Sequence, residues 1–397
     1  MSPGVLTTEE PGFSVSSMDK PANKKLNFGA VMTGLDLQNI SDAQVQALSD
    51  AIWIHKVVVV KNQNHVQPIK QWELVTRLDP EAEAVHGHGD LKTFNAKGGV
   101  LSRDRTVYAI PGAENVRVIG KGYQGSNHYG LVDTTIKAAP AHDYHALPLP
   151  DEEFEAGHTR FHRWHVDAAL YGRDPPKFTT LRCLKRPTGT EVSIHWDDGS
   201  GRTMKSEPGL TAFFSNVQAY DLMSDKEKRM ADHSWVEYAP HPYLWMGDCK
   251  SKPHGLGLES QNKEKSLDQL GAYDEKDVKR YPMVWVNPVT GEKSFMVHGI
   301  CVRKMFLRSS ADEEPTVVTD LAAIRAWLQQ IQERVLSPEY ILIPELAPGD
   351  IVMWANWQVF HSAVDYHPKL GPRTMHQANV GASTSPTGPV PIPAMAW

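Results

Sequence analysis

Residues 159–170 read Thr159-Arg-Phe-His-Arg-Trp-His-Val-Asp-Ala-Ala-Leu170, and the rest of the chain is interpreted from this stretch. In an extended strand, side chains alternate between two faces with a period of two residues. His165 and Asp167 are therefore expected to point the same way. One imidazole and one carboxylate on one face are two of the three ligands in a facial triad for non-heme Fe(II). The third ligand must be a distant His, and the best candidate is His361.

The His-x-Asp pattern is weak support by itself. In a chain with 18 His, about one or two such triples are expected by chance. The chain has three: His88-Gly-Asp90, His165-Val-Asp167 and His195-Trp-Asp197. The first lies among glycines, which predicts a loop, and the third runs into Asp-Gly-Ser-Gly, which predicts a hairpin end. The second is preceded by aromatic residues and followed by apolar ones, as expected of a buried strand. The alternative to a metal site is a His–Asp hydrogen bond within a protein core.

The composition is that of a soluble globular protein, with 397 residues of which 41% are hydrophobic and 22% charged. A net charge of -6 argues against nucleic acid or a membrane surface as partner, because both usually require a basic face. No apolar run approaches the roughly 20 residues that span a bilayer, and the N-terminus lacks the pattern of a secretory signal. Three widely spaced cysteines argue against a disulfide scaffold. We expect a reduced, cytoplasmic (cytosolic) protein, and the sequence is compatible with a homo-oligomer.

The chain divides into a polar, Pro-rich arm over residues 1–25 and one domain over residues 26–397. The arm is expected to be disordered or loosely held. Two stretches of the domain, about 86–150 and 202–280, are expected to be large insertions. The first is rich in Gly, Pro, Asn and His and has little periodicity, which is typical of functional or mobile loops. The second is expected to mix short helices and loops.

The domain is predicted to be mainly β, with helices flanking a β-sandwich or barrel. Ser41 is expected to cap a helix, with Gln44 at the capping-box position, and Pro68 to open a second helix. Apolar residues at three- and four-residue steps predict a third helix from about Asp320. Strands are predicted at 57–60, 178–184, 192–196, 282–286, 293–297, 348–354 (after a turn) and 373–380.

The last predicted strand adds strong support for a site. Arg373, Met375, Gln377 and Asn379 share parity, so all four are expected to face one way. A buried Arg is costly unless it meets an anion, and its planar fork suits a carboxylate. The alternative is an Arg that pairs with a buried Asp or Glu.

Together, His165-x-Asp167, His361 and Arg373 resemble the Fe(II)/2-oxoglutarate-dependent dioxygenases of the taurine and chlorophenoxyacetate dioxygenase type. The stretch Asn287-Pro-Val-Thr-Gly-Glu-Lys293 is similar to that family's Pro-x-Thr-Gly turn. The resemblance covers most of the chain, and the combination is specific where each piece alone is not. Further similar stretches lie at 29–37, 348–354 and 373–376.

The resemblance implies a double-stranded β-helix (jelly-roll) core and makes residues 26–397 a single catalytic domain. It implies Fe(II) held by His165, Asp167 and His361, and 2-oxoglutarate that chelates the iron while Arg373 binds its distal carboxylate. Three protein ligands leave three open positions on an octahedral iron, enough for the keto acid and O2. 2-Oxoglutarate would leave as succinate and CO2 while a C–H bond of a small-molecule substrate is oxidised.

The sequence departs from the family at two places. Residues 188–193 replace the usual Gly-Gly-Asp-Thr element, whose Thr helps to hold 2-oxoglutarate, and Thr190 is left open as a substitute. Gln377 stands where members with acidic substrates place a second Arg. An amide offers a donor and an acceptor without charge, and Asn379 would double that capacity. We therefore expect the substrate to present a neutral polar edge.

Within the family, Gln377 and Asn379 resemble the fungal xanthine dioxygenase subfamily, which hydroxylates xanthine at C8 to urate. Two amides suit the carbonyl and N–H groups of a purine, because a site lined by matched polar groups rejects analogues strongly. The subfamily also uses a Lys and an acid ahead of the metal ligands. By that resemblance Lys137 and Glu153 are catalytic candidates, although Phe154 stands where a second acid is expected. The alternatives are a solvated surface Lys and an acid at a helix start.

Three other interpretations stay open. A related 2-oxoglutarate-dependent hydroxylase could act on another neutral polar or heterocyclic small molecule. A metal-binding β-barrel could lack catalysis, although a degenerate site is expected to have lost a triad member or Arg373. A zinc hydrolase could use two His and one carboxylate, but Arg373 would then have no evident role.

Overall fold

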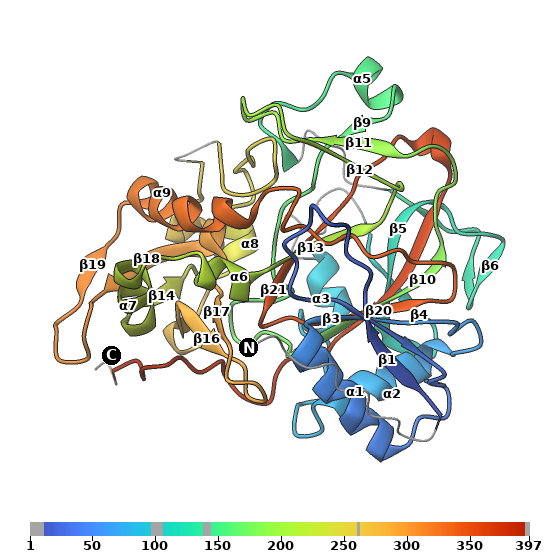
Figure 1. Ribbon diagram of the computed structural model, residues 1–397, viewed down its shortest axis with the longest axis horizontal. Coiled ribbons are helices and arrows are strands. Elements are labelled where there is room, and N and C mark those ends of the chain that lie inside the picture. The colour runs from blue at the N-terminus through green and yellow to red at the C-terminus, as the bar shows by residue number, and fades with distance from the viewer. Residues whose placement is uncertain (1–11, 97–105, 138–143, 260–262, 394–397) are drawn as a thin grey trace.

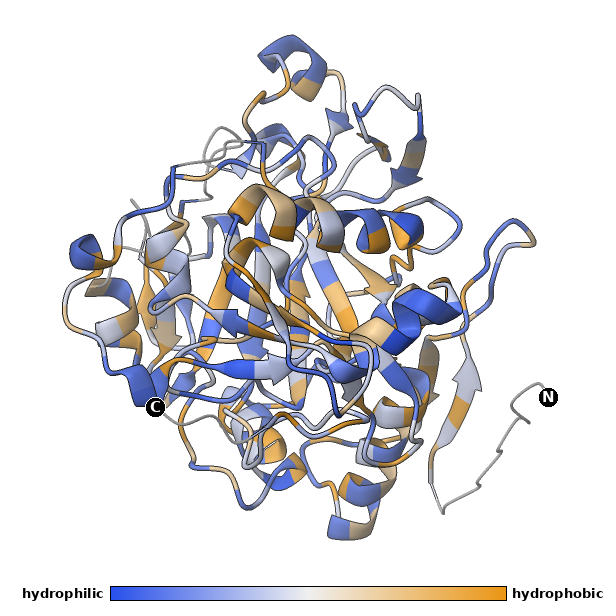
Figure 2. Ribbon diagram, turned by 90° about the vertical axis from the view of Figure 1, so that its left-hand side faces the viewer, coloured by the Kyte–Doolittle hydropathy of each residue, from blue (hydrophilic) through white to orange (hydrophobic). Residues whose placement is uncertain are grey.

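The computed structural model describes residues 12–96, 106–137, 144–259 and 263–393. Residues 1–11 of the expected arm lie outside the described residues, as do parts of both expected insertions. Every helix in the described ranges is too short or too polar to cross a lipid bilayer. Apolar residues are concentrated in the central strands, and the peripheral loops are mostly hydrophilic (Figure 2).

The largest sheet has nine strands within the described part of the chain, and all neighbours are antiparallel except β2 and β3 (Figure 1). In spatial order the strands are β1 (Ser14–Ser17), β2 (Ala30–Thr33), β3 (Val57–Val60), β20 (Ile351–Ala355), β10 (Phe178–Lys185), β22 (Arg373–Ala378), β5 (Ala113–Tyr123) and β4 (Tyr108–Ile110), with β8 (Thr135–Ile136) paired to β5. β3 is the predicted β-branched strand and is buried along its whole length.

Two helices pack on one face of this sheet. α1 (Asp42–His55) contacts β3 and β20, and α2 (Pro68–Leu78) contacts β10, β22 and β5 (Figure 1). α1 begins with the predicted capping box: Gln44 N donates to Ser41 Oγ at 3.2 Å, and Ser41 N donates to Gln44 Oε1 at 3.1 Å. α2 has Pro68 in its first turn, as predicted. The capping and first-turn residues thus set both helix starts.

A second layer faces the large sheet. Its centre is the antiparallel pair β13 (Thr211–Ser215) and β21 (Val359–Ala363), the strand that carries His361. Beside it lie β9 (His158–Thr159), β11 (Val192–His195) and β12 (Thr203–Ser206), where β11 and β12 form the predicted hairpin. Short elements complete this part of the molecule: α3 (Leu91–Ala96), α5 (Asp151–Glu155), β6 (Asn127–His128) and β7 (Leu131–Val132).

The remaining elements form a lobe on the left of Figure 1. Its helix α9 (Leu321–Gln332) confirms the predicted amphipathic helix, with Asp320 as N-cap and Ile324 and Leu328 buried. The predicted hairpin at 282–297 is confirmed as β16 (Val284–Val286) and β17 (Lys293–Phe295). The other members are α6 (Asn216–Asp221), α7 (Asp225–His233), α8 (Pro242–Trp245), β14 (Trp235–Tyr238), β15 (Arg280–Pro282), β18 (Val302–Leu307) and β19 (Thr316–Val318).

The segment of His165 and Asp167 is not the regular strand that its alternation predicts. After Thr159 it forms no continuous ladder among the described residues: it has isolated bridges between Phe161 and Val364 and between His165 and His361, and single backbone hydrogen bonds elsewhere. The period-two argument still holds locally, because the side chains of His165 and Asp167 line the same cavity.

The stretches expected to be an arm and insertions contain integral strands. β1, in the arm, pairs with β2 through backbone hydrogen bonds that need no apolar side chains. β13, in the expected insertion at 202–280, pairs with β21. β5, in the expected insertion at 86–150, is an 11-residue strand of the large sheet. The sequence of β5 lacks the regular apolar–polar alternation of a strand, because Arg117 and Lys121 line a cavity and Gly120 interrupts the alternation. Glycine is required there, since a Cβ at φ +154 would come within 1.9 Å of Arg373 O.

Candidate active site

A cavity of about 260 Å³ lies between the large sheet and the β13–β21 pair. Five strands of the large sheet and both strands of the pair contribute side chains to its wall, and loops complete it. Its wall includes His88, Phe94, Arg117, Lys121, Ile136, His162, His165, Asp167, Leu181, Thr211, Tyr243, Ile300, Trp354, His361, Asp365, Arg373 and Gln377.

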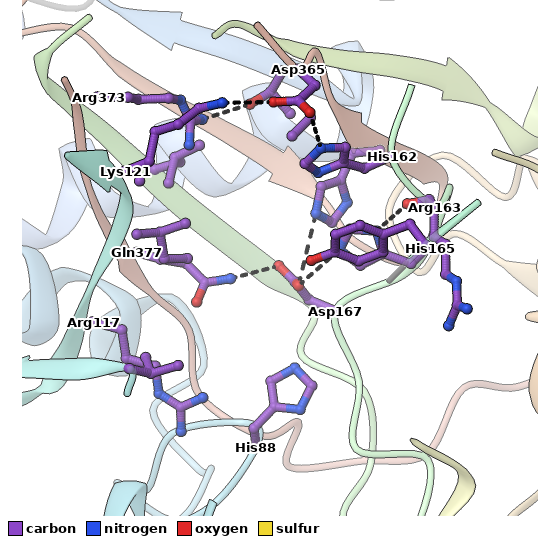
Figure 3. Close-up of a pocket in the computed structure, with 18 of the residues that line it drawn as sticks. His88, Arg117, Lys121, His162, Arg163, His165, Asp167, Asp365, Arg373 and Gln377 are labelled. Atoms are coloured by element: carbon purple, nitrogen blue, oxygen red, sulfur yellow. Dashed lines mark hydrogen bonds and ion pairs between the residues drawn. The ribbon is translucent and has the colours of Figure 1, made fainter. Parts of the chain in front are cut away.

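The three predicted metal ligands meet in this cavity (Figure 3). His165 and His361 exchange two backbone hydrogen bonds: His165 N donates to His361 O at 3.1 Å, and His361 N donates to His165 O at 3.0 Å. This bridge sets their rings side by side, with centroids 4.1 Å apart. One donor atom each from His165, Asp167 and His361 lies within 4.8 Å of the other two.

Neighbouring groups fix the orientation of these ligands. His165 Nδ1 lies 2.8 Å from Arg163 O, which turns Nε2 toward the cavity. Gln377 Nε2 donates to Asp167 Oδ2 at 3.1 Å. The backbone of Asp167 is held on both sides by Asn356, whose amide accepts from Asp167 N at 3.0 Å and donates to Asp167 O at 2.7 Å. Such outer contacts usually hold metal ligands in place.

The three residues fit Fe(II). Two imidazoles and one carboxylate are the donor set of a facial iron triad. Burial, and then the neighbouring His165, lower the pKa of His361 well below its usual value, so this ring stays neutral and offers a lone pair. His165 Nε2 and His361 Nε2 lie 3.9 and 3.8 Å from Asp167 Oδ1. Both distances are too long for hydrogen bonds, so the two rings and the carboxylate face a common space without being bonded to one another.

Arg373 is buried at one end of the cavity. Its Nε donates to Gly209 O at 2.6 Å, and its Nη2 lies 3.5 Å from Thr211 Oγ1. The acid in this region, Asp365, pairs instead with Lys121 at 2.8 Å and with His162 at 3.3 Å. Among the described residues Arg373 therefore has no carboxylate partner, which disfavours the alternative of a buried Arg–acid pair.

Three predicted site residues do not line the cavity. Lys137 is exposed, although the preceding Ile136 is a lining residue. Glu153 is exposed on α5, where one oxygen lies 3.7 Å from His158 Nδ1. Asn379 is buried, with its amide bonded to Thr179 Oγ1 and Gly87 N, both at 3.2 Å. The roles predicted for these three residues stay predictions. Gln377, in contrast, lies in the wall beside Asp167.

Other cavity residues were not found from the sequence. His88 belongs to a His-x-Asp triple expected in a loop; its ring reaches the cavity, whereas Asp90 accepts from Thr93 N at 2.9 Å at the start of α3. Arg117 faces the cavity from β5. The signal that leads to Arg117 is the pairing of β5 with β22, which places it opposite Gln377.

The chain matches the family described as "Taurine catabolism dioxygenase TauD, TfdA family" over residues 19–379. It is 40% identical to the alpha-ketoglutarate-dependent dioxygenase bsc9 of Alternaria brassicicola over 391 residues, which cover 97% of this chain and 98% of that protein. It is 39% identical to the alpha-ketoglutarate-dependent xanthine dioxygenase xanA of Emericella nidulans over 372 residues, which cover 94% of this chain and 97% of that protein.

The fold is similar to that of a solved taurine dioxygenase from Burkholderia xenovorans. The TM-score is 0.53 at 17% sequence identity, with 96% of this chain and 94% of the other covered. The architecture, mostly sheet with some helices, is thus of the type found in this family. From the family match, the relatives and the His-Asp-His group together, we conclude that the chain belongs to the TauD/TfdA family and is an Fe(II)- and 2-oxoglutarate-dependent dioxygenase.

Proposed function

We propose that this dioxygenase hydroxylates xanthine at C8. In the overall reaction, xanthine, 2-oxoglutarate and O2 give urate, succinate and CO2. The observation that carries the proposal is a polar wall beside the predicted metal ligands, formed by Gln377, Arg117 and His88. Polar groups matched to a purine's carbonyl and ring nitrogen atoms favour that substrate over apolar ones. The 39% identity to a protein named as a xanthine dioxygenase supports the same choice.

The proposal assigns each end of the cavity a ligand. His165, Asp167 and His361 would hold Fe(II), and Arg373 with Thr211 would bind the distal carboxylate of 2-oxoglutarate. When bound, the iron and 2-oxoglutarate supply the oxidising chemistry that activates O2. The large sheet and the β13–β21 pair are assigned as the two walls of a double-stranded β-helix, which their positions on either side of the cavity support.

The chain's own residues orient the reactants and exclude water. Gln377 steadies the carboxylate of Asp167. Leu181, Trp354, Tyr243 and Ile300 contribute apolar surface to the cavity wall. An enclosed, partly apolar site protects a strong oxidant from side reactions. A cytosolic location stays a prediction.

A second candidate is hydroxylation of another small molecule by the same chemistry. Lys137, Glu153 and Asn379 lie outside the cavity wall, so the structure offers no described role for them in holding a purine. Apolar lining residues such as Phe94 and Ile300 suit a substrate with a larger apolar body. The relative bsc9, whose name gives no substrate, is as similar to this chain as the xanthine dioxygenase is.

An anaerobic titration tests the proposal. Fe(II) and 2-oxoglutarate bound to the protein should give a weak visible charge-transfer band, and xanthine should perturb it saturably. Xanthosine is the matched control, because it keeps both carbonyl groups of xanthine while its ribose blocks the imidazole edge where C8 must approach the metal. A band that responds to neither compound, or to both alike, would remove xanthine and favour the second candidate. Absence of the band itself would contradict iron and 2-oxoglutarate binding at this site.

A further inference from the structure

Arg117 places a buried positive charge in the cavity wall. It belongs to β5 and lies directly opposite Gln377 of β22 in the antiparallel register. Its residue is only 3% exposed, and its side chain lines the cavity together with that of Gln377. The sequence predicts a neutral wall here, because Gln377 stands where family members with acidic substrates place an Arg. Arg117 of β5 therefore places a positive charge next to the position of Gln377 on β22.

The guanidinium is only partly satisfied by the protein. Nη2 donates to Gly89 O at 2.9 Å, and the group stacks over the Phe94 ring at 4.6 Å. Nε is buried without a hydrogen-bond partner. No carboxylate of the described residues forms an ion pair with it. Burial lowers the pKa of Arg117 to about 10, which leaves the guanidinium protonated at neutral pH.

A buried guanidinium without an ion-pair partner is costly, and an acceptor group of a ligand that meets it reduces this penalty. The contact of Arg117 with the Phe94 ring and its hydrogen bond to Gly89 O hold the guanidinium at this part of the wall. The planar fork of a guanidinium suits two adjacent acceptor atoms in its own plane. Gln377 cannot fully serve this purpose, since its N–H group is already bonded to Asp167.

The cavity thus has two cationic anchors at different ends. Arg373 pairs in register with Lys121, and Gln377 pairs with Arg117, so the anchors are four positions apart on both strands. Four strand residues span about 14 Å. Figure 3 shows Arg373 and Lys121 at one end, His165, Asp167 and Gln377 in the middle, and Arg117 facing His88 at the other end. A 2-oxoglutarate on Arg373 leaves Arg117 available to the substrate.

We infer that Arg117 is the residue that anchors the primary substrate, through a planar edge that carries an anion or two adjacent acceptor atoms. The inference rests on the proposed function, since it assumes that the substrate enters this cavity. It makes the substrate class more specific: an acidic heterocycle, such as xanthine with its carbonyl and ionisable N–H groups, or a carboxylate of similar size. An anchor of this kind excludes a neutral substrate that has few hydrogen-bond acceptor atoms.

The test measures binding, apart from turnover. Dissociation constants for xanthine and for benzoate, a planar carboxylate, are taken from the anaerobic visible band of wild type and Arg117→Met. Loss of a charge-assisted pair of hydrogen bonds should weaken binding about 10- to 100-fold. The affinity for 2-oxoglutarate should stay within about twofold. Arg117→Lys, which keeps the charge but loses the fork, should give an intermediate value, and it serves if the Met variant does not fold.

Arg182→Met is the matched control, because Arg182 is a buried arginine of β10 outside the cavity wall that donates to Val66 O and Asn64 O. It should not change the affinity for either probe. Benzoate binding that depends on Arg117, without any xanthine binding, would support the anchor and remove xanthine as substrate. Equal affinities in wild type and Arg117→Met for every probe that binds, or no binding of either probe to wild type, would overturn the inference.

Discussion

Gln377 of β22 and Arg117 of β5 are direct cross-strand neighbours, and both reach the cavity where His165, Asp167 and His361 meet. Gln377 uses its amide N–H to hold Asp167, whereas Arg117 keeps donor capacity for a ligand. The sequence predicts a substrate contact for Gln377 together with Asn379, and the structure adds a hydrogen bond from Gln377 to the carboxylate of Asp167. Gln377 supports a predicted metal ligand, and Arg117 is the proposed anchor of the substrate.

The first prediction concerns the metal. Addition of Mn(II) with 2-oxoglutarate should raise the midpoint of thermal unfolding of the wild type, because ligand at 100 times its Kd stabilises the folded state by about 2.7 kcal/mol. His165→Ala should abolish this rise, since it removes one of three ligands. His195→Ala is the control: it lies in a similar His-x-Asp triple but on β11, outside the cavity wall. Equal rises in both variants would contradict the proposed ligand set.

The second prediction concerns 2-oxoglutarate. Arg373→Ala should raise the KM for 2-oxoglutarate by about 10- to 100-fold, because a buried charge-assisted pair is lost. The dissociation constant for xanthine should change little. Steady-state kinetics with each compound varied in turn separate the effects. If Arg373→Ala weakened xanthine and Arg117→Met weakened 2-oxoglutarate, the two ends of the cavity would have to be exchanged.

The third prediction concerns Gln377. Gln377→Leu keeps the side-chain volume but removes the donor to Asp167 Oδ2. Loss of such a support typically lowers metal affinity 10- to 100-fold. We expect weaker Fe(II) binding and lower xanthine turnover, while 2-oxoglutarate still binds once the metal is saturating. An unchanged Fe(II) affinity with a raised KM for xanthine would instead make Gln377 mainly a substrate contact.

The fourth prediction concerns stability in acid. The pKa of Glu227 is lowered to about 2, chiefly by a hydrogen bond from Arg334. Burial acts in the opposite direction, and hydrogen bonds from Ser224 lower the pKa further. A lowered carboxyl pKa stabilises the fold above the unfolded value near 4.3 and loses this effect as pH falls toward 2. Urea midpoints at pH 7 and pH 3 should therefore differ less in Glu227→Gln than in wild type. The pair's contribution to the change in unfolding free energy between pH 7 and pH 3 should stay below about 1 kcal/mol, because both side chains are partly exposed. A larger acid sensitivity in the variant would contradict this sign.

Local sequence signals predicted the elements whose causes are local. Capping at Ser41 and the stripe of α9 follow from interactions within one helix, and the structure has both. The residues of the metal group could also be chosen, although His165 and Asp167 alone are one of three similar triples. The distant His361 and Arg373, with the family resemblance that they complete, distinguish this triple from the other two.

Long-range pairing explains what the sequence did not reveal. β5 has no clear alternation, because polar Arg117 and Lys121 face a cavity where a core strand would carry apolar residues. Arg117 can be recognised as a cavity residue only from its register opposite Gln377. His88 likewise depends on a loop that folds back over the site. None of these relationships has a pattern within one short stretch of the chain.

The most direct test of the proposed function is the ratio of products in a single turnover. O2 is admitted to the anaerobic complex of enzyme, Fe(II), 2-oxoglutarate and xanthine, and urate and succinate are quantified together. The proposal predicts about one urate for each succinate, because each 2-oxoglutarate consumed should oxidise one xanthine. Succinate without urate would contradict xanthine as the substrate.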